Sequence, residues 1–118
     1  MGTENRSFDS PEEHRELDKT SIDILRFGDA EVGRFTFEPS WKWSECIKPA
    51  VGTDRCQNDH VGYLTSGRMI VEDADGAQTE ISAGMAYRIP PGHDAWIVGD
   101  EAAVALEFKS AGDYAVAK

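Results

Sequence analysis

The fold is decided by residues 84–93, which read Gly-Met-Ala-Tyr-Arg-Ile-Pro-Pro-Gly-His. Glycine adopts backbone angles that other residues avoid, so Gly84 predicts a tight turn before a short strand. The two prolines fix the direction of the chain and cannot donate to a central sheet ladder, so the strand ends before them. This bracketed strand delivers His93 to one defined place, and a second histidine, His60, begins another strand. Two such elements that converge inside a small β barrel would form a metal or ligand pocket.

Outward from this stretch, the rest of the chain divides into short β segments. Apolar and polar residues alternate with the period of a strand, and turn residues recur about every 8–12 positions. Two hairpin turns are predicted, at Ser66-Gly67 and at residues 73–76. Nine or so short strands of this kind are typical of an all-β sandwich or barrel. The predicted strands are 22–27, 32–37, 41–46, 60–65, 68–72, 78–81, 85–89, 95–98 and 104–108.

The first 19 residues are polar and charged, and we predict an N-terminal arm at 1–19 followed by one barrel domain at 20–118. Residues 10–13, Ser-Pro-Glu-Glu, are typical of a helix start, with a capping serine, a proline at the first helical position and then acids. Two alternatives follow for the arm: a flexible segment or one short helix.

The chain length and the net charge indicate which classes of partner the protein can bind. A chain of 118 residues suits one domain, and 12 Lys plus Arg against 22 Asp plus Glu give a net charge of −10. An acidic surface repels phosphate backbones and anionic lipids, so neither nucleic acid nor a membrane is an expected partner. The chain start lacks an apolar secretory core, and we expect a cytoplasmic protein. Cys46 and Cys56 are then expected to be thiols, with a disulfide between them as the alternative.

Two stretches, residues 56–76 and 84–101, resemble the two sequence motifs of the cupin superfamily. The first contains Tyr-Leu-Thr-Ser-Gly at 63–67, which is similar to the strand–glycine hairpin of the family. The second contains the glycine, the strand, the Pro-x-Gly turn and the histidine. The resemblance covers about residues 32–108 and implies a small single-domain cupin, a jelly-roll barrel or double-stranded β-helix. It also implies a homodimer.

The family also suggests which residues would hold a metal. Its first motif has two histidines one residue apart, then a glutamate and a glycine. Counting back from Gly67, His60 stands at the glutamate position, Cys56 at the second histidine and Asp54 at the first. The resemblance thus implies Cys56 and His60 as ligands and Asp54 as a further candidate.

The second motif supplies the remaining ligand. In the family the ligand histidine stands a few residues after the Pro-x-Gly glycine. Counted forward from Gly92, the family's spacing falls on Ala95. His93 stands two residues earlier, so it matches the ligand position if the loop is shorter than in the family. We therefore predict a metal site formed by Cys56, His60 and His93.

These residue types also indicate which metals would bind. In an extended strand Cys56 and His60 would lie about 13 Å apart, so residues 57–59 must bend, and Asn-Asp suits a turn. A thiolate and two imidazoles favour zinc, with iron, nickel, copper and manganese as alternatives. Three protein ligands leave a position open for a substrate or water. Cys46 is either a further ligand or a buried apolar thiol.

Aromatic and basic side chains near these motifs are candidates for holding a small organic ligand. Rings would form an apolar pocket and an arginine would pair with a carboxylate, although packing in the core explains the rings equally well. The ligand-binding candidates are Trp43, Tyr63, Tyr87, Arg88 and Trp96. The candidate acceptors that would orient the histidine rings are Glu45, Asp94 and Tyr87.

Three functions fit these features. The first is a module that binds or senses a metal, a small metabolite or both. The second is a small metal-dependent enzyme, in which the ion acts as a Lewis acid on an oxygen-bearing substrate or activates water. The third is a metal-free structural barrel that dimerises. The unusual ligand set favours the first, and no catalytic residue is assigned from the sequence.

Overall fold

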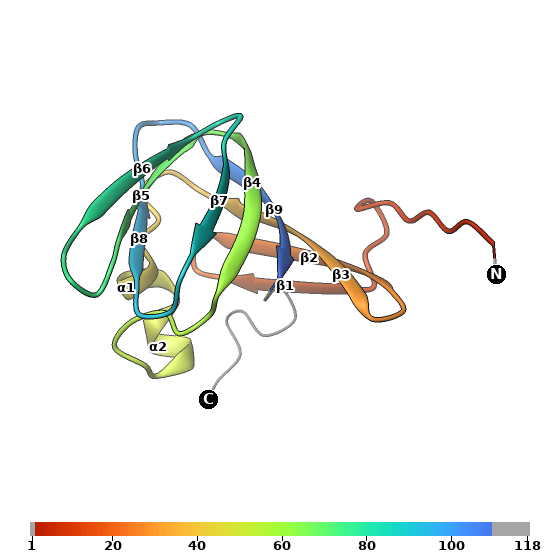
Figure 1. The fold of residues 1–118 in the computed structure, drawn as a ribbon, viewed down its shortest axis with the longest axis horizontal. Coiled ribbons are helices and arrows are strands. Elements are labelled where there is room, and N and C mark those ends of the chain that lie inside the picture. The colour runs from red at the N-terminus through yellow and green to blue at the C-terminus, as the bar shows by residue number, and fades with distance from the viewer. Residues whose placement is uncertain (1, 110–118) are drawn as a thin grey trace.

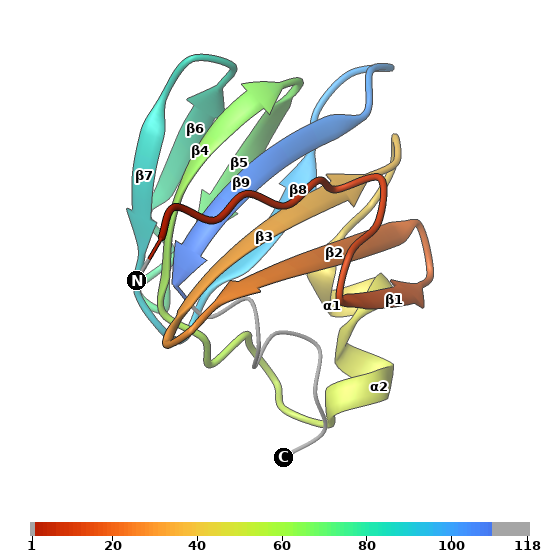
Figure 2. The same cartoon turned by 90° about the vertical axis from the view of Figure 1, so that its right-hand side faces the viewer.

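The protein consists of two antiparallel β-sheets whose inner faces enclose one hydrophobic core (Figures 1 and 2). A computed structural model describes residues 2–109 of the 118-residue chain. Its elements are β1 (Glu13–Leu17), β2 (Thr20–Phe27), β3 (Ala30–Phe37), α1 (Trp43–Cys46), α2 (Lys48–Val51), β4 (His60–Ser66), β5 (Arg68–Glu72), β6 (Gln78–Ser82), β7 (Ala86–Ile89), β8 (Asp94–Ile97) and β9 (Ala103–Lys109). The larger sheet has the order β1-β2-β3-β9-β4-β7, and the smaller sheet has the order β6-β5-β8.

The predicted all-β architecture is confirmed. From residue 60 onward every predicted strand exists and differs from the observed strand by no more than one residue at either end. The alternation along each strand sets its inner face, because successive side chains point to opposite sides. β4, for example, buries His60, Gly62 and Leu64 and exposes the residues between them.

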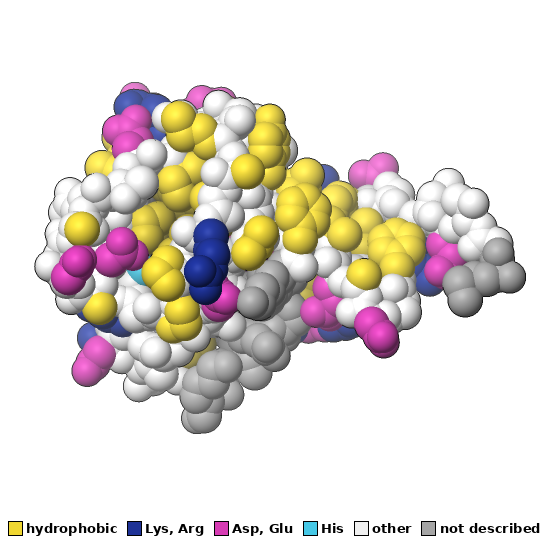
Figure 3. All heavy atoms as spheres, viewed as in Figure 1, with side chains coloured by type: hydrophobic (Ala, Val, Ile, Leu, Met, Phe, Trp, Pro, Cys, Tyr) yellow, Lys and Arg dark blue, Asp and Glu magenta, His cyan; other side chains and the backbone are white. Residues whose placement is uncertain are grey.

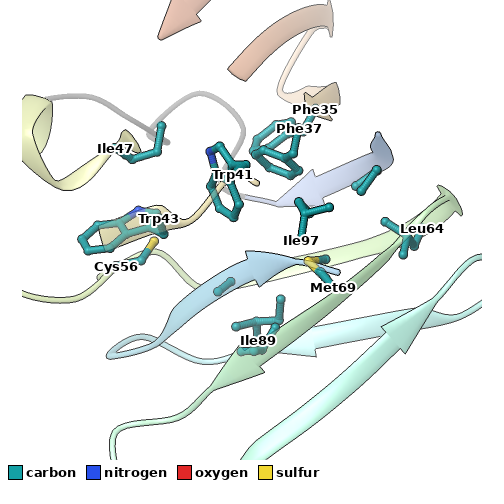
Figure 4. Packing of buried hydrophobic residues seen from close by; sticks show 14 of the residues in the cluster. Phe35, Phe37, Trp41, Trp43, Ile47, Cys56, Leu64, Met69, Ile89 and Ile97 are labelled. Atoms are coloured by element: carbon teal, nitrogen blue, oxygen red, sulfur yellow. The ribbon is translucent and has the colours of Figure 1, made fainter. Parts of the chain in front are cut away.

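The core between the sheets is formed by aliphatic and aromatic side chains from both of them. Phe37 and Trp41 lie with their ring centroids 4.2 Å apart (Figure 4). The indole Nε1 of Trp41 donates to Thr20 Oγ1 at 2.8 Å, so the one polar atom of this buried ring is satisfied.

The prediction of a short helix in the N-terminal segment is wrong, because Glu13–Leu17 form strand β1 instead. β1 pairs with β2 from Glu13↔Ile24 to Leu17↔Thr20. Hydrogen bonding to the neighbouring strand overrides the local capping signal, as tertiary context often does. Charged contacts add to the pairing: His14 Nδ1 lies 2.6 Å from Asp23 Oδ1. β1 thus belongs to the large sheet, and the division at residue 20 stays a prediction.

The segment predicted as a strand at 41–46 contains a helical turn instead. The amide of Ile47 donates to the carbonyl of Trp43 at 2.9 Å, which closes α1. In a helix, residues three apart share a face, so Trp43 and Cys46 are both buried while Glu45 is exposed.

Among the described residues, no helix has the length and apolar character needed to cross a membrane.

One of the two predicted hairpins is also wrong. β5 and β6 pair through the turn at residues 73–76, as predicted. β4 and β5 do not pair with each other, because the chain crosses from the large sheet to the small one at Gly67. Gly67 has φ +80°, and a Cβ on it would lie 2.6 Å from the Cα of Ala103. The crossing therefore needs glycine for its backbone angle and for its close approach to β9.

Candidate metal centre

Cys56, His60 and His93 lie together inside the protein. Their exposed fractions are 2%, 4% and 3%. One donor atom from each lies within 4.8 Å of the donor atoms of the other two, and Cys56 Sγ is 3.6 Å from His60 Nε2. The structure thus brings together the three residues that the sequence motifs suggested. That they bind a metal stays a prediction.

The backbone explains how residues so far apart in the sequence meet. Cys56 forms an isolated β-bridge with His93, in which the Cys56 amide donates to the His93 carbonyl at 2.8 Å and the Gly92 amide donates to the Cys56 carbonyl at 2.7 Å. Residues 57–59 connect Cys56 to the start of β4 without regular secondary structure, and His60 Nε2 lies 3.6 Å from Cys56 Sγ. The proline turn after β7 therefore places His93 directly beside the cysteine.

The second ring nitrogen of each histidine is held by an acceptor. His93 Nδ1 lies 2.7 Å from the Pro90 carbonyl oxygen, which can only accept, so Nδ1 carries the hydrogen. His60 Nδ1 lies 2.6 Å from Oε1 of Glu107 and donates to that carboxylate. In both rings Nε2 is therefore the nitrogen that would bind a metal. Histidines that ligate metals are oriented in this way in proteins.

Glu107 is the site residue that the sequence analysis missed. Its side chain is 5% exposed on β9, and its second oxygen accepts a hydrogen bond from the Tyr87 hydroxyl. Gly62 lies between them, paired with Tyr87 on β7 and with Glu107 on β9. A Cβ on Gly62 would lie 2.7 Å from the Tyr87 hydroxyl oxygen, so this glycine leaves the room in which Tyr87 reaches Glu107.

A sequence signal for Glu107 did exist. It stands two and four residues after Ala105 and Ala103, so strand alternation puts all three on the buried face. Of the three proposed orienting residues, Tyr87 reaches the site through Glu107, and the other two lie elsewhere. Glu45 is exposed, and Asp94 accepts hydrogen bonds from backbone amides.

The three donors shift one another's proton affinity. Burial raises the pKa of the Cys56 thiol, but hydrogen bonds with His60 and His93 outweigh it and lower that pKa to about 6. For His60 burial lowers the pKa, and hydrogen bonds with Cys56 and Glu107 raise it to about 10. At neutral pH the metal-free site therefore contains a thiolate beside an imidazolium that faces a carboxylate.

This charge state predicts a pH dependence of metal binding. A metal on His60 Nε2 must displace a proton, so between the Cys56 pKa of about 6 and the His60 pKa of about 10 binding releases one proton. The affinity should rise about tenfold per pH unit between about pH 7 and pH 9. Chelator competition across this range measures the slope. An affinity that is flat with pH would contradict the assignment of His60 as a ligand.

The further ligand candidates are not placed with these three. The Asp54 carboxylate is fully exposed and lies 3.5 Å from Lys48 Nζ. Cys46 is buried in α1, where burial raises the pKa of its thiol, and it is absent from the group of donors. Both cysteines are free thiols, so the disulfide alternative is excluded.

An inner cavity of about 30 Å³ adjoins the donors. This is the space of about one or two water molecules. Its walls include His60, His93, Glu107, Trp43 and Tyr87, so two of the predicted ligand-binding residues do line it.

The other three predicted ligand-binding residues do not line this inner cavity. Tyr63 and Trp96 alternate with buried neighbours and lie on the outer faces of β4 and β8. The cation of Lys42 lies 5.2 Å from the centroid of the Trp96 ring. Arg88 is on the surface, 3.3 Å from Asp59.

Comparison with known proteins identifies the fold. No protein-family model matches the sequence, and no curated protein matches it. A solved structure of a sugar phosphate isomerase from a cupin superfamily, from Silicibacter pomeroyi, is 19% identical and has a TM-score of 0.63 over 88% of this chain and 73% of its own. The chain has the fold of a small cupin. This confirms the fold class that the two motifs suggested.

Two other solved structures extend the likeness over more of the chain. KdgF from a Halomonas species is 17% identical, with a TM-score of 0.62 over 92% of this chain and 94% of its own. A protein of unknown function from Rhizobium leguminosarum bv. viciae is 16% identical, with a TM-score of 0.65 over 92% of this chain and 97% of its own. At these identities the likeness concerns the fold alone.

Proposed function

We propose that this cupin binds one divalent metal ion, zinc by preference, through Cys56, His60 and His93, and that it acts as a binding or sensing module for a small ligand. One observation carries the proposal: three buried donors converge while Glu107 and Pro90 hold the far side of both rings. Thiolate and imidazole donors suit zinc, with iron, nickel, copper and manganese as alternatives. Three ligands leave a fourth tetrahedral position open.

The proposed protein is cytoplasmic and homodimeric, and its partners are small molecules. A cytoplasmic location agrees with the two free thiols, Cys46 and Cys56. A homodimer is the assembly that the family resemblance implied. Small molecules, rather than nucleic acids or membranes, are the partners that suit a net charge of −10.

A metal-dependent enzyme is the second candidate, and Tyr87 is the observation that favours it. Tyr87 borders the inner cavity, and its hydroxyl is bonded to Glu107, which also holds His60. A proton-bearing group beside an open metal position is what Lewis-acid or water-activating chemistry needs. One structure with the same fold is described as a sugar phosphate isomerase, which supports a test of turnover.

The metal content of the purified protein tests the proposal. Untagged protein from zinc-replete medium should hold about one metal per chain by elemental analysis. Cys56→Ser and His93→Ala should each hold less than about a tenth of that. Cys46→Ser is the matched control, since Cys46 is also buried but outside the group of donors, and it should keep its metal. A metal-free wild type, or equal loss in the control, would overturn the proposal.

A further inference from the structure

A second, larger depression lies outside the metal centre. A groove of about 260 Å³ runs along β6 and β7, each an edge strand of one of the two sheets. Figure 3 shows hydrophobic side chains gathered on this side of the molecule, with acidic and basic side chains around them. The inner cavity of about 30 Å³ holds little more than water. An organic ligand of metabolite size therefore fits the groove and not the inner cavity.

The groove and the inner cavity share a wall. Tyr87 and Ile89 line both of them. Tyr87 stands between the groove and the Glu107–His60 pair, because its hydroxyl donates to Glu107. A molecule in the groove would thus lie against the hydrogen-bonded chain that ends at the proposed metal ligands.

The groove is apolar in its interior. Its aliphatic lining comes from both sheets and includes Val71 and Ile81 of the small sheet and Ile89 of the large one. Met85, between β6 and β7, is 50% exposed, which is a large exposure for an apolar side chain. An unbranched thioether is an adaptable contact for an apolar group of a ligand.

Charges of opposite sign stand on the two sides of this lining. Asp73 and Glu80 come from the β5–β6 hairpin, and Arg88 comes from β7. The Asp73 carboxylate has no hydrogen-bond or ion-pair partner among residues 2–109, and Glu80 has only Arg68 at 3.7 Å. The Arg88 side chain is 69% exposed, with one contact of 3.3 Å to Asp59. Both signs are therefore available to a ligand.

We propose that this groove binds a small zwitterion with an apolar body, of the amino acid or dipeptide class. The ammonium lies against Asp73 and Glu80, the carboxylate against Arg88, and the apolar part against Ile81, Met85 and Ile89. This deepens the proposed function by naming the class of the small ligand, and its biological role rests on that function. Its binding does not need the metal, because none of the charged groove residues is a proposed metal ligand.

Calorimetric titration with dileucine tests the proposal. The N-acetyl form lacks the ammonium, and the C-terminal amide lacks the carboxylate; L-leucine serves as a shorter zwitterion. Dileucine should bind, and each blocked form should bind at least about tenfold more weakly, since each loses one charge-assisted contact. Equal affinity of a blocked form, or no binding of either zwitterion up to about 10 mM, would overturn the proposal.

Groove variants locate the two charges. Asp73→Asn with Glu80→Gln should weaken dileucine but leave the N-acetyl form unchanged, because that form has no ammonium to lose. Arg88→Gln should weaken dileucine but leave the amide unchanged. Asp29→Asn, at an exposed turn outside the groove, is the control and should change nothing. If both groove variants bind dileucine as the wild type does, the zwitterion is not held in this groove.

The titration is repeated on Cys56→Ser. Dileucine binding that persists in this variant supports the groove whatever the metal content shows. Metal without dileucine binding would leave the metal site standing and remove the groove proposal. The two proposals therefore fail separately.

Discussion

Replacing Glu107 with glutamine is expected to destabilise the metal-free protein by about 1.5–3 kcal/mol, because the buried His60 ring keeps its contact with Cys56 but loses its charge-assisted hydrogen bond to a carboxylate. The Glu107 side chain is 5% exposed, and its carboxylate accepts from both His60 Nδ1, at 2.6 Å, and the Tyr87 hydroxyl. A glutamine has nearly the same shape, so the loss would come from charge and not from volume. Urea unfolding at pH 7 measures the change in the free energy of unfolding.

The same substitution should weaken metal binding by about 10–100-fold, as is usual when the acceptor behind a ligating histidine is lost. Glu101→Gln is the control, since Glu101 is exposed in the turn before β9, and both its unfolding midpoint and its metal affinity should match the wild type. A Glu107→Gln protein that unfolds at the wild-type urea concentration and binds metal equally well would show that Glu107 does not support His60.

The second large effect is expected at Gly67. Substitution by alanine puts a Cβ 2.6 Å from the Cα of Ala103 and 2.7 Å from the carbonyl oxygen of Ala102, so the backbone of one sheet must move away from the other. Overpacking of this kind costs about 1–3 kcal/mol, and the left-handed backbone adds about 1 kcal/mol more. Denaturant unfolding should show that the free energy of unfolding falls by about 2–4 kcal/mol in total.

Gly76→Ala separates the two contributions. Gly76 has φ +89°, close to the +80° of Gly67, but a Cβ on Gly76 would meet nothing within 4 Å. The free energy of unfolding of Gly76→Ala should therefore fall by about 1 kcal/mol, which is the backbone contribution alone. Equal losses in the two variants would show that the approach of Gly67 to β9 is not tight.

The sequence predicted most strands because each is bounded by its own turn residues. The segment Arg68–Glu72 was predicted with its observed bounds, since Gly67 and the turn at residues 73–76 enclose it. What a turn connects is not a local property. Ser66-Gly67 would suit a hairpin or a crossing equally well, and only the packing of Gly67 on Ala103 selects the crossing. In the same way, pairing with β2, not local propensity, makes β1 a strand.

The candidate site was predictable to the extent that local motifs carry it. Cys56 and His60 are four residues apart, and His93 follows the proline turn, so the motifs led to all three. Glu107 is 47 residues from His60, and no motif links them. A charged side chain also suggests a surface position; strand alternation puts Glu107 on the buried face, but only the pairing of β9 with β4 brings it close to His60. Tyr63 and Trp96 lie on the outer faces of β4 and β8, and strand alternation in the sequence already indicates that position.

The position of β1 at the edge of the large sheet affects how the protein can associate with other chains. It covers one long side of β2, whose Ile22 and Ile24 are fully buried, and it carries charges on both of its own faces. An uncovered β2 would present unpaired amides and carbonyls to any other chain, which is how sheets grow from one molecule into the next. Removal of β1 would open this edge of β2 to pairing with another chain, and the charged side chains of β1 oppose such pairing at the new edge that β1 itself forms.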